Sequence, residues 1–344
     1  MNMSTISPTA GRLRAYLRFI VAVLWFFLAR GLAHRLALGE ATAPFLPLVE
    51  QAILAFLLLL GYAAMGFWLD REPNPVSAQG LPWRTGWPGE AGMGLAVGWA
   101  LAVACVLPMV VGGGIAIVLV LGHSAWGWLA ADAAFFALAA LVEEIAFRGY
   151  GFQRFERAVG PLGAALGFAA FYAIVQALLP GSNHASMAVS VMLSLVLSTA
   201  YLRSRALWVS WGINFGWKAS RALVFGLAIS GVSGHSPVVQ GNPMGPFWLT
   251  GGGFGLDGSW VAFVALLIAL PVVYRLTREL DYKYNAPVIV PGGIPVDLGA
   301  AGQRQHEAAM GPAAPAAPSL VQILPFATPP PELPSAEKPP AASE

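Results

Sequence analysis

Residues 142–149 read Val-Glu-Glu-Ile-Ala-Phe-Arg-Gly and close a long apolar run that begins near Trp128. An ionisable side chain at the centre of a membrane-spanning helix costs roughly 2.5 to 3.5 kcal/mol, so such residues persist mainly where they are paired or functional. If the run is helical, Glu144 and Arg148 lie four residues apart on one face and can form an ion pair. Glu143 is rotated by about 100° from Glu144 and can therefore face another element.

Glu143 has two interpretations. A carboxylate sheltered from bulk water can serve as a general base, which makes Glu143 a candidate for activating a water molecule. Alternatively, the stretch holds one internal ion pair, and the second glutamate extends its carboxylate to the nearby membrane surface. Both interpretations stay open from this stretch alone.

The composition is that of a membrane protein. Hydrophobic residues make up 57% of the 344 residues and charged residues only 10%, and the mean hydropathy is +0.66. Soluble proteins carry about a quarter of their residues as charged ones. The net charge of +2 is small and the basic residues are scattered, which argues against nucleic acid as a partner.

Apolar segments predict an all-α, polytopic fold with about eight transmembrane helices. They lie at about residues 19–38, 45–69, 91–122, 127–149, 161–179, 185–202, 206–230 and 259–276. The third segment is too long for one straight helix, and Pro108 with the glycines at 112–114 predicts a kink or a break in it. Polar residues on the fourth, fifth and seventh segments predict a polar cavity inside the membrane.

Basic residues predict the topology. With the N-terminus in the cytoplasm, the loops that carry Lys and Arg all fall on the cytoplasmic side and the opposite loops carry none, and only Arg30 and Arg35 depart from this rule. The chain is therefore predicted to be a multi-pass protein of a bacterial cytoplasmic membrane, with both termini cytoplasmic. Residues 1–285 form the predicted bundle, whereas residues 286–344 are rich in Pro and Ala and predict a disordered tail.

Two further polar groups lie within predicted helices. Tyr172 and Gln176 lie four residues apart on one face of the fifth segment. Asn214, Lys218 and Arg221 form one stripe of the seventh segment, at positions i, i+4 and i+7. Such a stripe has little reason to face lipid, so we hypothesise that Lys218 lies within ion-pairing reach of Glu143.

The pattern Glu-Glu-x-x-x-Arg at residues 143–148 resembles the first motif of the CPBP family of intramembrane proteases. This family includes the CAAX prenyl endopeptidases and the bacteriocin-processing proteins. Residues 172–176 and 214–218 fall where the family has its second and third motifs, and the resemblance covers about residues 125–278. In the family, histidine ends the second motif and begins the third, and asparagine ends the third. Here those positions hold Gln176, Asn214 and Lys218.

The resemblance implies that Glu143 and the residue at Gln176 activate water, and that Asn214 and Lys218 stabilise an oxyanion. A glutamine can hydrogen-bond a water molecule but cannot exchange a proton near neutral pH. An asparagine amide can still donate to an oxyanion. The ammonium of Lys218 can do the same, but paired with Glu143 it could also occupy the place of the water. These replacements bear against full proteolytic activity.

None of the five histidines falls at a motif position; they are His34, His123, His184, His235 and His306. Glutamine is not an ordinary ligand of Zn²⁺. We therefore predict no catalytic metal and no cofactor.

Two functions compete for this sequence. The first is an intramembrane endopeptidase of the CAAX-protease type, acting on a membrane-embedded or lipidated peptide. Its predicted catalytic residues are Glu143, Glu144, Arg148, Gln176, Asn214 and Lys218. The second is a noncatalytic descendant that uses the same cavity to bind a peptide or a transmembrane helix, or to scaffold partners. A transporter is a weaker third, because no inverted repeat is evident. The predicted partners are membrane lipid and a peptide or helix substrate, and the sequence leaves the oligomeric state open.

Overall fold

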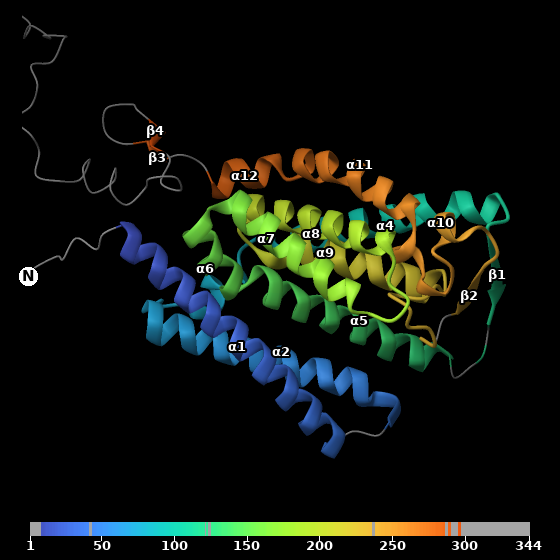
Figure 1. The fold of residues 1–344 in the computed structure, drawn as a ribbon, viewed down its shortest axis with the longest axis horizontal. Helices are drawn as coiled ribbons and strands as arrows, with labels where there is room; N and C mark the ends of the chain where they lie inside the picture. The colour runs from blue at the N-terminus through green and yellow to red at the C-terminus, as the bar shows by residue number, and fades with distance from the viewer. Residues whose placement is uncertain are drawn as a thin grey trace, which may run out of the picture. The chain divides into compact units, whose positions relative to one another are not determined.

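The structure is a computed structural model, in which helices form most of the described chain (Figure 1). It describes residues 8–40, 43–120, 122, 125–235, 238–285, 288–289 and 295–296. The chain divides into two compact units, Met1–Ala286 and Pro287–Glu344. Most of the predicted disordered tail lies outside the described residues. Within the second unit, β3 (Val288–Ile289) pairs antiparallel with β4 (Pro295–Val296).

The first unit is a bundle of long helices joined by short ones. The long helices are α1 (Pro8–Glu40), α2 (Leu46–Asp70), α4 (Trp87–Val111), α5 (Ala125–Arg148), α7 (Pro161–Ala177), α8 (His184–Ser204), α9 (Leu207–Ala219) and α11 (Trp260–Leu276). The shorter helical elements are η1 (Ala43–Phe45), α3 (Pro75–Ala78), α6 (Tyr150–Val159), η2 (Ser220–Val224), α10 (Phe247–Thr250), η3 (Gly252–Phe254), η4 (Leu256–Gly258) and α12 (Arg278–Tyr284).

Each of the eight predicted segments is helical, over all or most of its length. By length and hydropathy, four described helices can cross a membrane, namely α1, α2, α4 and α8, and a fifth span results if α11 and α12, bent by 50°, count as one. α7 and α9 have 17 and 13 residues, fewer than the ~20 that span a bilayer.

α5 occupies the position that decides the site. α5 packs against α2 and against α9, so it lies between two parts of the apolar interior. One core cluster joins α1, α2, α5 and α6, and a second joins α4, α8, α9 and α11. Tyr172 on α7 packs against both clusters. The polar end of α5 is thus enclosed between two apolar cores.

α4 and α9 make the most extensive helix contact of the bundle, because glycines line it. A Cβ atom added to Gly98 would lie 2.3 Å from the carbonyl oxygen of Ile213, and one added to Gly212 would lie 2.3 Å from that of Ala91. Small residues let helix backbones approach closely in a membrane, where burial from water supplies no driving force. This contact fixes α9, which carries Asn214 and Lys218.

The third predicted segment breaks at its glycines, as expected, but continues beyond them as a strand and not as a helix. Pro108 lies in the last turn of α4, the helix ends at Val111, and the chain continues as a strand, β1 (Ile115–Leu119). β1 pairs antiparallel with β2 (Val239–Pro243), with Ile115 opposite Pro243. The glycines at 112–114 therefore mark the end of a helix, and a small sheet accompanies the otherwise helical fold.

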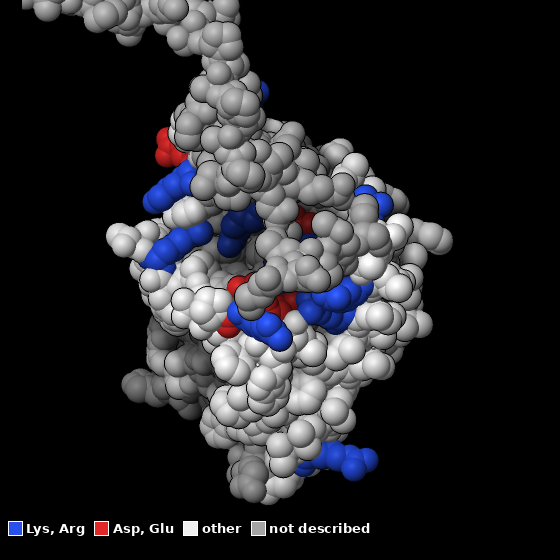
Figure 2. Space-filling view, turned by 90° about the vertical axis from the view of Figure 1, so that its left-hand side faces the viewer, with Lys and Arg blue, Asp and Glu red and all other residues white. Residues whose placement is uncertain are grey.

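The loops with Lys and Arg meet at one end of the bundle. Arg84 donates to the carbonyl oxygen of Ser204 at 2.8 Å, Arg205 pairs with Glu156 at 2.8 Å, and Arg203 pairs with Asp281 at 2.9 Å. Figure 2 shows Lys and Arg side chains on this face. The chain is a membrane protein with several apolar helices, while the cytoplasmic placement of this end stays a prediction.

Candidate active site

The end of α5 forms the predicted internal ion pair. Arg148 donates from NH1 to Oε1 of Glu144 at 3.1 Å, one helical turn apart, and both side chains are buried. The other terminal nitrogen of Arg148, Nη2, lies 3.3 Å from both the carbonyl oxygen and the hydroxyl of Ser194 on α8. The buried charge of Glu144 is therefore compensated within its own helix.

Asn214 connects the two glutamates. Its Nδ2 group donates to Oε2 of Glu143 at 3.0 Å and to Oε1 of Glu144 at 3.1 Å. Asn214 is buried on α9, the helix that the close contact with α4 holds in place. One amide thus fixes the relative positions of both carboxylates.

Lys218 forms an ion pair with Glu143 through Nζ and Oε1. The predicted contact between these two residues is confirmed. The side chain of Lys218 keeps 12% of its surface accessible and that of Glu143 keeps 28%, so this pair lies at the edge of the cluster and Glu144 lies inside it. Four residues, Glu143, Glu144, Arg148 and Lys218, give the cluster balanced formal charge, as a polar group within a membrane protein requires.

The cluster joins α5 and α9, with Glu143 as its accessible side, and the polar cavity that was to include α7 stays a prediction. Gln176 on α7 lies in a different network. Its Nε2 group donates to the hydroxyl of Ser230 at 3.3 Å. No hydrogen bond among the described residues joins Gln176 to Glu143 or Glu144. The structure thus brings five of the six predicted site residues together and separates the sixth.

The network around Gln176 contains a second buried ion pair, which the sequence reasoning missed. Arg221 donates from NH1 to Oδ1 of Asp257 at 2.6 Å, and both residues are buried. The backbone N–H and the hydroxyl of Ser230 donate to Oδ2 of the same aspartate at 3.0 and 2.9 Å. The sequence signal for this pair is Arg221 itself, the third member of the polar stripe, which lies on η2 directly after α9 and needs its own counterion.

No described histidine pairs with Glu143 or Glu144. His34 pairs with Glu50 at 3.0 Å, His184 is exposed at the start of α8, and His235 lies 3.9 Å from Asp132. His123 and His306 lie outside the described residues. Within the described ranges no group of three or more His, Cys, Asp or Glu is arranged to hold a metal ion. The prediction of no metal and no cofactor stays a prediction.

The catalytic roles of the six residues also stay predictions, but the arrangement has clear chemical capacity. The carboxylate of Glu143 can accept a proton, while Asn214 and Lys218 donate hydrogen bonds beside it. Hydrogen-bond donors fixed in advance near a reacting group are the usual means of stabilising an oxyanion.

Comparison with known proteins gives one match. Residues 124–220 match the family model described as "Rce1-like: Type II CAAX prenyl endopeptidase Rce1-like". No curated protein and no solved structure matches the chain. The matched residues run from the start of α5 through the end of α9 and include all six predicted site residues. Over these residues, the chain is similar to the type II CAAX prenyl endopeptidases, which supports the resemblance of its motifs to the CPBP family.

Proposed function

We propose that the chain is an endopeptidase that hydrolyses a membrane-embedded or lipidated peptide beside Glu143. The observation that carries this proposal is the position of the Glu143 carboxylate. It is held by Asn214 and Lys218, yet 28% of its side chain remains accessible. A carboxylate has about four lone-pair sites, so two such bonds leave room for a water molecule to donate a third.

In the first step, Glu143 accepts a proton from this water as its oxygen bonds to the carbonyl carbon of the scissile peptide. The carbonyl oxygen becomes an oxyanion, which the Asn214 amide and the Lys218 ammonium stabilise. Loss of one oxyanion donor typically costs about 10² to 10³ in rate, which sets the scale of their contribution. In the second step, the C–N bond breaks and protonated Glu143 returns the proton to the amine nitrogen. The products are a carboxylate and an amine.

Glu144 and Arg148 act through position in this scheme. Their buried pair ties the end of α5 to α8 through Ser194, and Glu144 holds Asn214 at the same time. Gln176 takes no proton, because an amide does not titrate near neutral pH. Gln176 instead donates a hydrogen bond to Ser230, and Ser230 donates to Asp257. Asp257 pairs with Arg221, which lies one turn after Lys218, so this network borders the site.

A second candidate function is noncatalytic binding of a peptide or transmembrane helix at the same cluster. Two observations favour it. Lys218 contacts Glu143 directly, and a paired ammonium competes with water for the carboxylate. Gln176 turns its amide to Ser230, so this position supplies no second group for activating water.

A cleavage assay in proteoliposomes separates the two functions. A prenylated CAAX peptide is the first probe, because the matched family is described by that substrate. Wild type, Glu143→Ala and Gln176→His are compared at equal amounts of folded protein, with product identified by mass spectrometry. Product from wild type that is lost in Glu143→Ala supports the endopeptidase. Product that appears only in Gln176→His supports a binding protein that has lost catalysis.

A further inference from the structure

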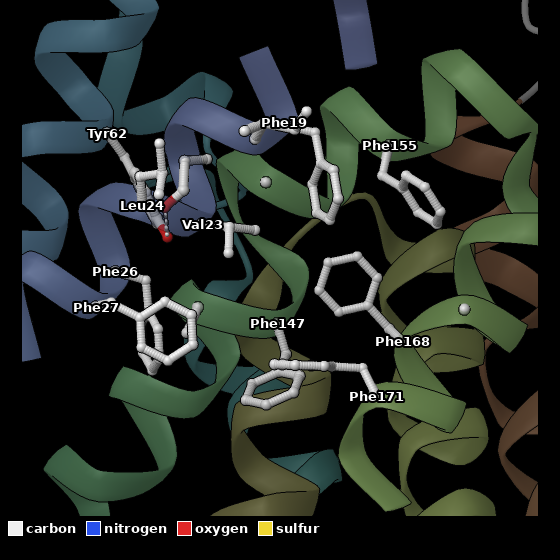
Figure 3. Close-up of a pocket in the computed structure, with 15 residues that line it drawn as sticks. Phe19, Val23, Leu24, Phe26, Phe27, Tyr62, Phe147, Phe155, Phe168 and Phe171 are labelled. Carbon is white, nitrogen blue, oxygen red and sulfur yellow. Dashed lines mark hydrogen bonds between the residues drawn. The ribbon is translucent and has the colours of Figure 1, made fainter. Parts of the chain in front are cut away.

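An apolar cavity of about 280 Å³ lies between α1, α2, α5, α6 and α7. Phenylalanine side chains from α1, α5, α6 and α7 surround it (Figure 3). The only polar side-chain atom among its lining residues is the hydroxyl of Tyr62, which donates to the carbonyl oxygen of Ala22 at 3.3 Å. The cavity therefore suits a hydrocarbon and offers no group to bind a polar ligand.

The cavity extends along α1 from Phe19 to Phe27, a rise of about 12 Å along the helix. Leu24 and Phe27 line it and are 64% and 56% exposed. The cavity thus opens sideways on an apolar surface of a helix long and apolar enough to cross a membrane. A hydrocarbon chain lying parallel to α1 can enter it directly from the bilayer.

Basic residues gather at the Phe19 end of this cavity. Arg12, Arg14 and Arg18 precede Phe19 on α1, and Arg154 and Arg157 flank the lining residue Phe155 on α6. Asp70 accepts hydrogen bonds from both Arg18 and Arg154, so one carboxylate serves two guanidinium groups. Among the ion pairs of the described residues, none involves Arg12, Arg14 or Arg157. The end of the cavity therefore carries net positive charge.

A phospholipid has the same order of parts, with a phosphate at the membrane surface and a chain below it. Clusters of Lys and Arg beside transmembrane helices attract anionic headgroups. We propose that this cavity binds one acyl chain of an anionic phospholipid, whose phosphate lies against the arginines of α1 and α6. Ala146 and Phe147, which line the cavity, follow the two glutamates on α5. The bound chain thus packs against the helix that carries the site and supports its position.

The first experiment uses the full-length wild type in detergent micelles and counts retained lipids by native mass spectrometry. Phosphatidylglycerol and phosphatidylcholine of equal chain length are added, together with a short-chain phosphatidylglycerol. We expect one long-chain phosphatidylglycerol to be retained in preference to both others. Equal retention of the two headgroups, or of the short chain, would overturn the proposal without any variant being made.

A matched pair of variants tests the cavity itself. Val23 lines the cavity, whereas Val21 lies two residues away on the same helix, is exposed and does not line it. Val23→Phe fills part of the space, and displacing roughly two methylene groups corresponds to about tenfold weaker retention of phosphatidylglycerol. Val21→Phe should retain it as wild type does. Equal retention by both variants would place the lipid elsewhere.

A second pair tests the charge. Arg14→Gln with Arg157→Gln should abolish the preference for phosphatidylglycerol over phosphatidylcholine, whereas Arg275→Gln with Arg278→Gln removes the same charge at α11 and α12 and should leave it intact. The same loss in both double variants would mean that net charge, not this site, selects the lipid. A prenylated peptide that is retained where phosphatidylglycerol is not would assign the cavity to a substrate chain. Retention is measured without turnover, so these outcomes are independent of proteolysis.

Discussion

Lys218 and Glu143 lie 75 residues apart in the sequence and form an ion pair that joins α9 to α5. Both belong to the segment that matches the CAAX endopeptidase family model. The pair lies beside the hydrogen bonds from Asn214 to Glu143 and Glu144. It follows that α9 holds the acidic pair through two side chains one helical turn apart.

Removal of one partner of this pair should destabilise the protein. Lys218→Met leaves Glu143 partly buried without its cation, and we expect a loss of about 1–2 kcal/mol in the free energy of unfolding, below the cost of a fully buried pair because both groups are partly accessible. Lys218→Arg keeps the charge and should lose less. Denaturant unfolding in detergent measures both. The double variant Glu143→Gln with Lys218→Met is the control. If its loss in the free energy of unfolding equals the sum of the losses in the two single variants, the pairing is contradicted.

The close contact between α4 and α9 gives a prediction with a control on the same helix. A Cβ added at Gly98 meets backbone of α9 at 2.3 and 2.6 Å, whereas one added at Gly92 meets nothing within 4 Å. We expect Gly98→Ala to destabilise by about 1–3 kcal/mol through overpacking. Gly92→Ala should be neutral or stabilising by up to about 1 kcal/mol, because alanine favours helix. Melting temperatures in detergent distinguish them, and equal values would contradict the described contact.

Removing one partner of the buried ion pair of Arg221 and Asp257 should destabilise the protein strongly, whereas replacing both residues by apolar ones should not. Asp257→Ala leaves a buried guanidinium without a counterion, and we expect about 3–5 kcal/mol of destabilisation. Arg221→Met combined with Asp257→Leu removes both charges and should recover most of this loss. Thermal unfolding of the three variants is the test. No recovery in the double variant would mean that the hydrogen bonds to Ser230, not the charges, hold this loop.

His235 should make stability depend on pH. Burial lowers the pKa of His235 from its ordinary value of 6.5, against the opposing effect of Asp132. As the pH falls below about 6.5, the unfolded chain binds a proton that the folded imidazole does not, so stability is lost on acidification and retained above that pH. His235→Gln should reduce this loss, and His184→Gln, at an exposed position, should not. Unfolding measured from pH 7.5 to 5.5 decides it, and equal slopes in both variants would refute the role of His235.

Part of this site could be predicted from the sequence. Helical spacing alone relates Glu144 to Arg148 and Asn214 to Lys218. The expense of an unpaired charge in a membrane then predicts that Lys218 meets Glu143. The resemblance to the CPBP family placed the three segments in one site, and the family model matches the same region.

Three features of the structure have no corresponding pattern in the sequence. The hydrogen bond from Gln176 to Ser230 depends on the path of a Gly-rich loop, which no sequence periodicity encodes. The resemblance alone therefore predicts Gln176 beside the glutamates. The counterion of Arg221 lies in the same loop, at Asp257. Beyond the glycines at 112–114, the residues of β1 are as apolar as those of α4, so composition does not distinguish a strand from a helix there.

The central claim is that Glu143 activates water for peptide cleavage. Its most direct test is the initial rate of cleavage of a prenylated CAAX peptide in proteoliposomes by wild type, by Glu143→Gln and by Glu50→Gln, whose glutamate pairs with His34 away from the site. We predict that Glu143→Gln lowers the rate by about 10² to 10⁴, the usual contribution of a general base, while Glu50→Gln cleaves as wild type does. Cleavage by Glu143→Gln at the wild-type rate would contradict the claim.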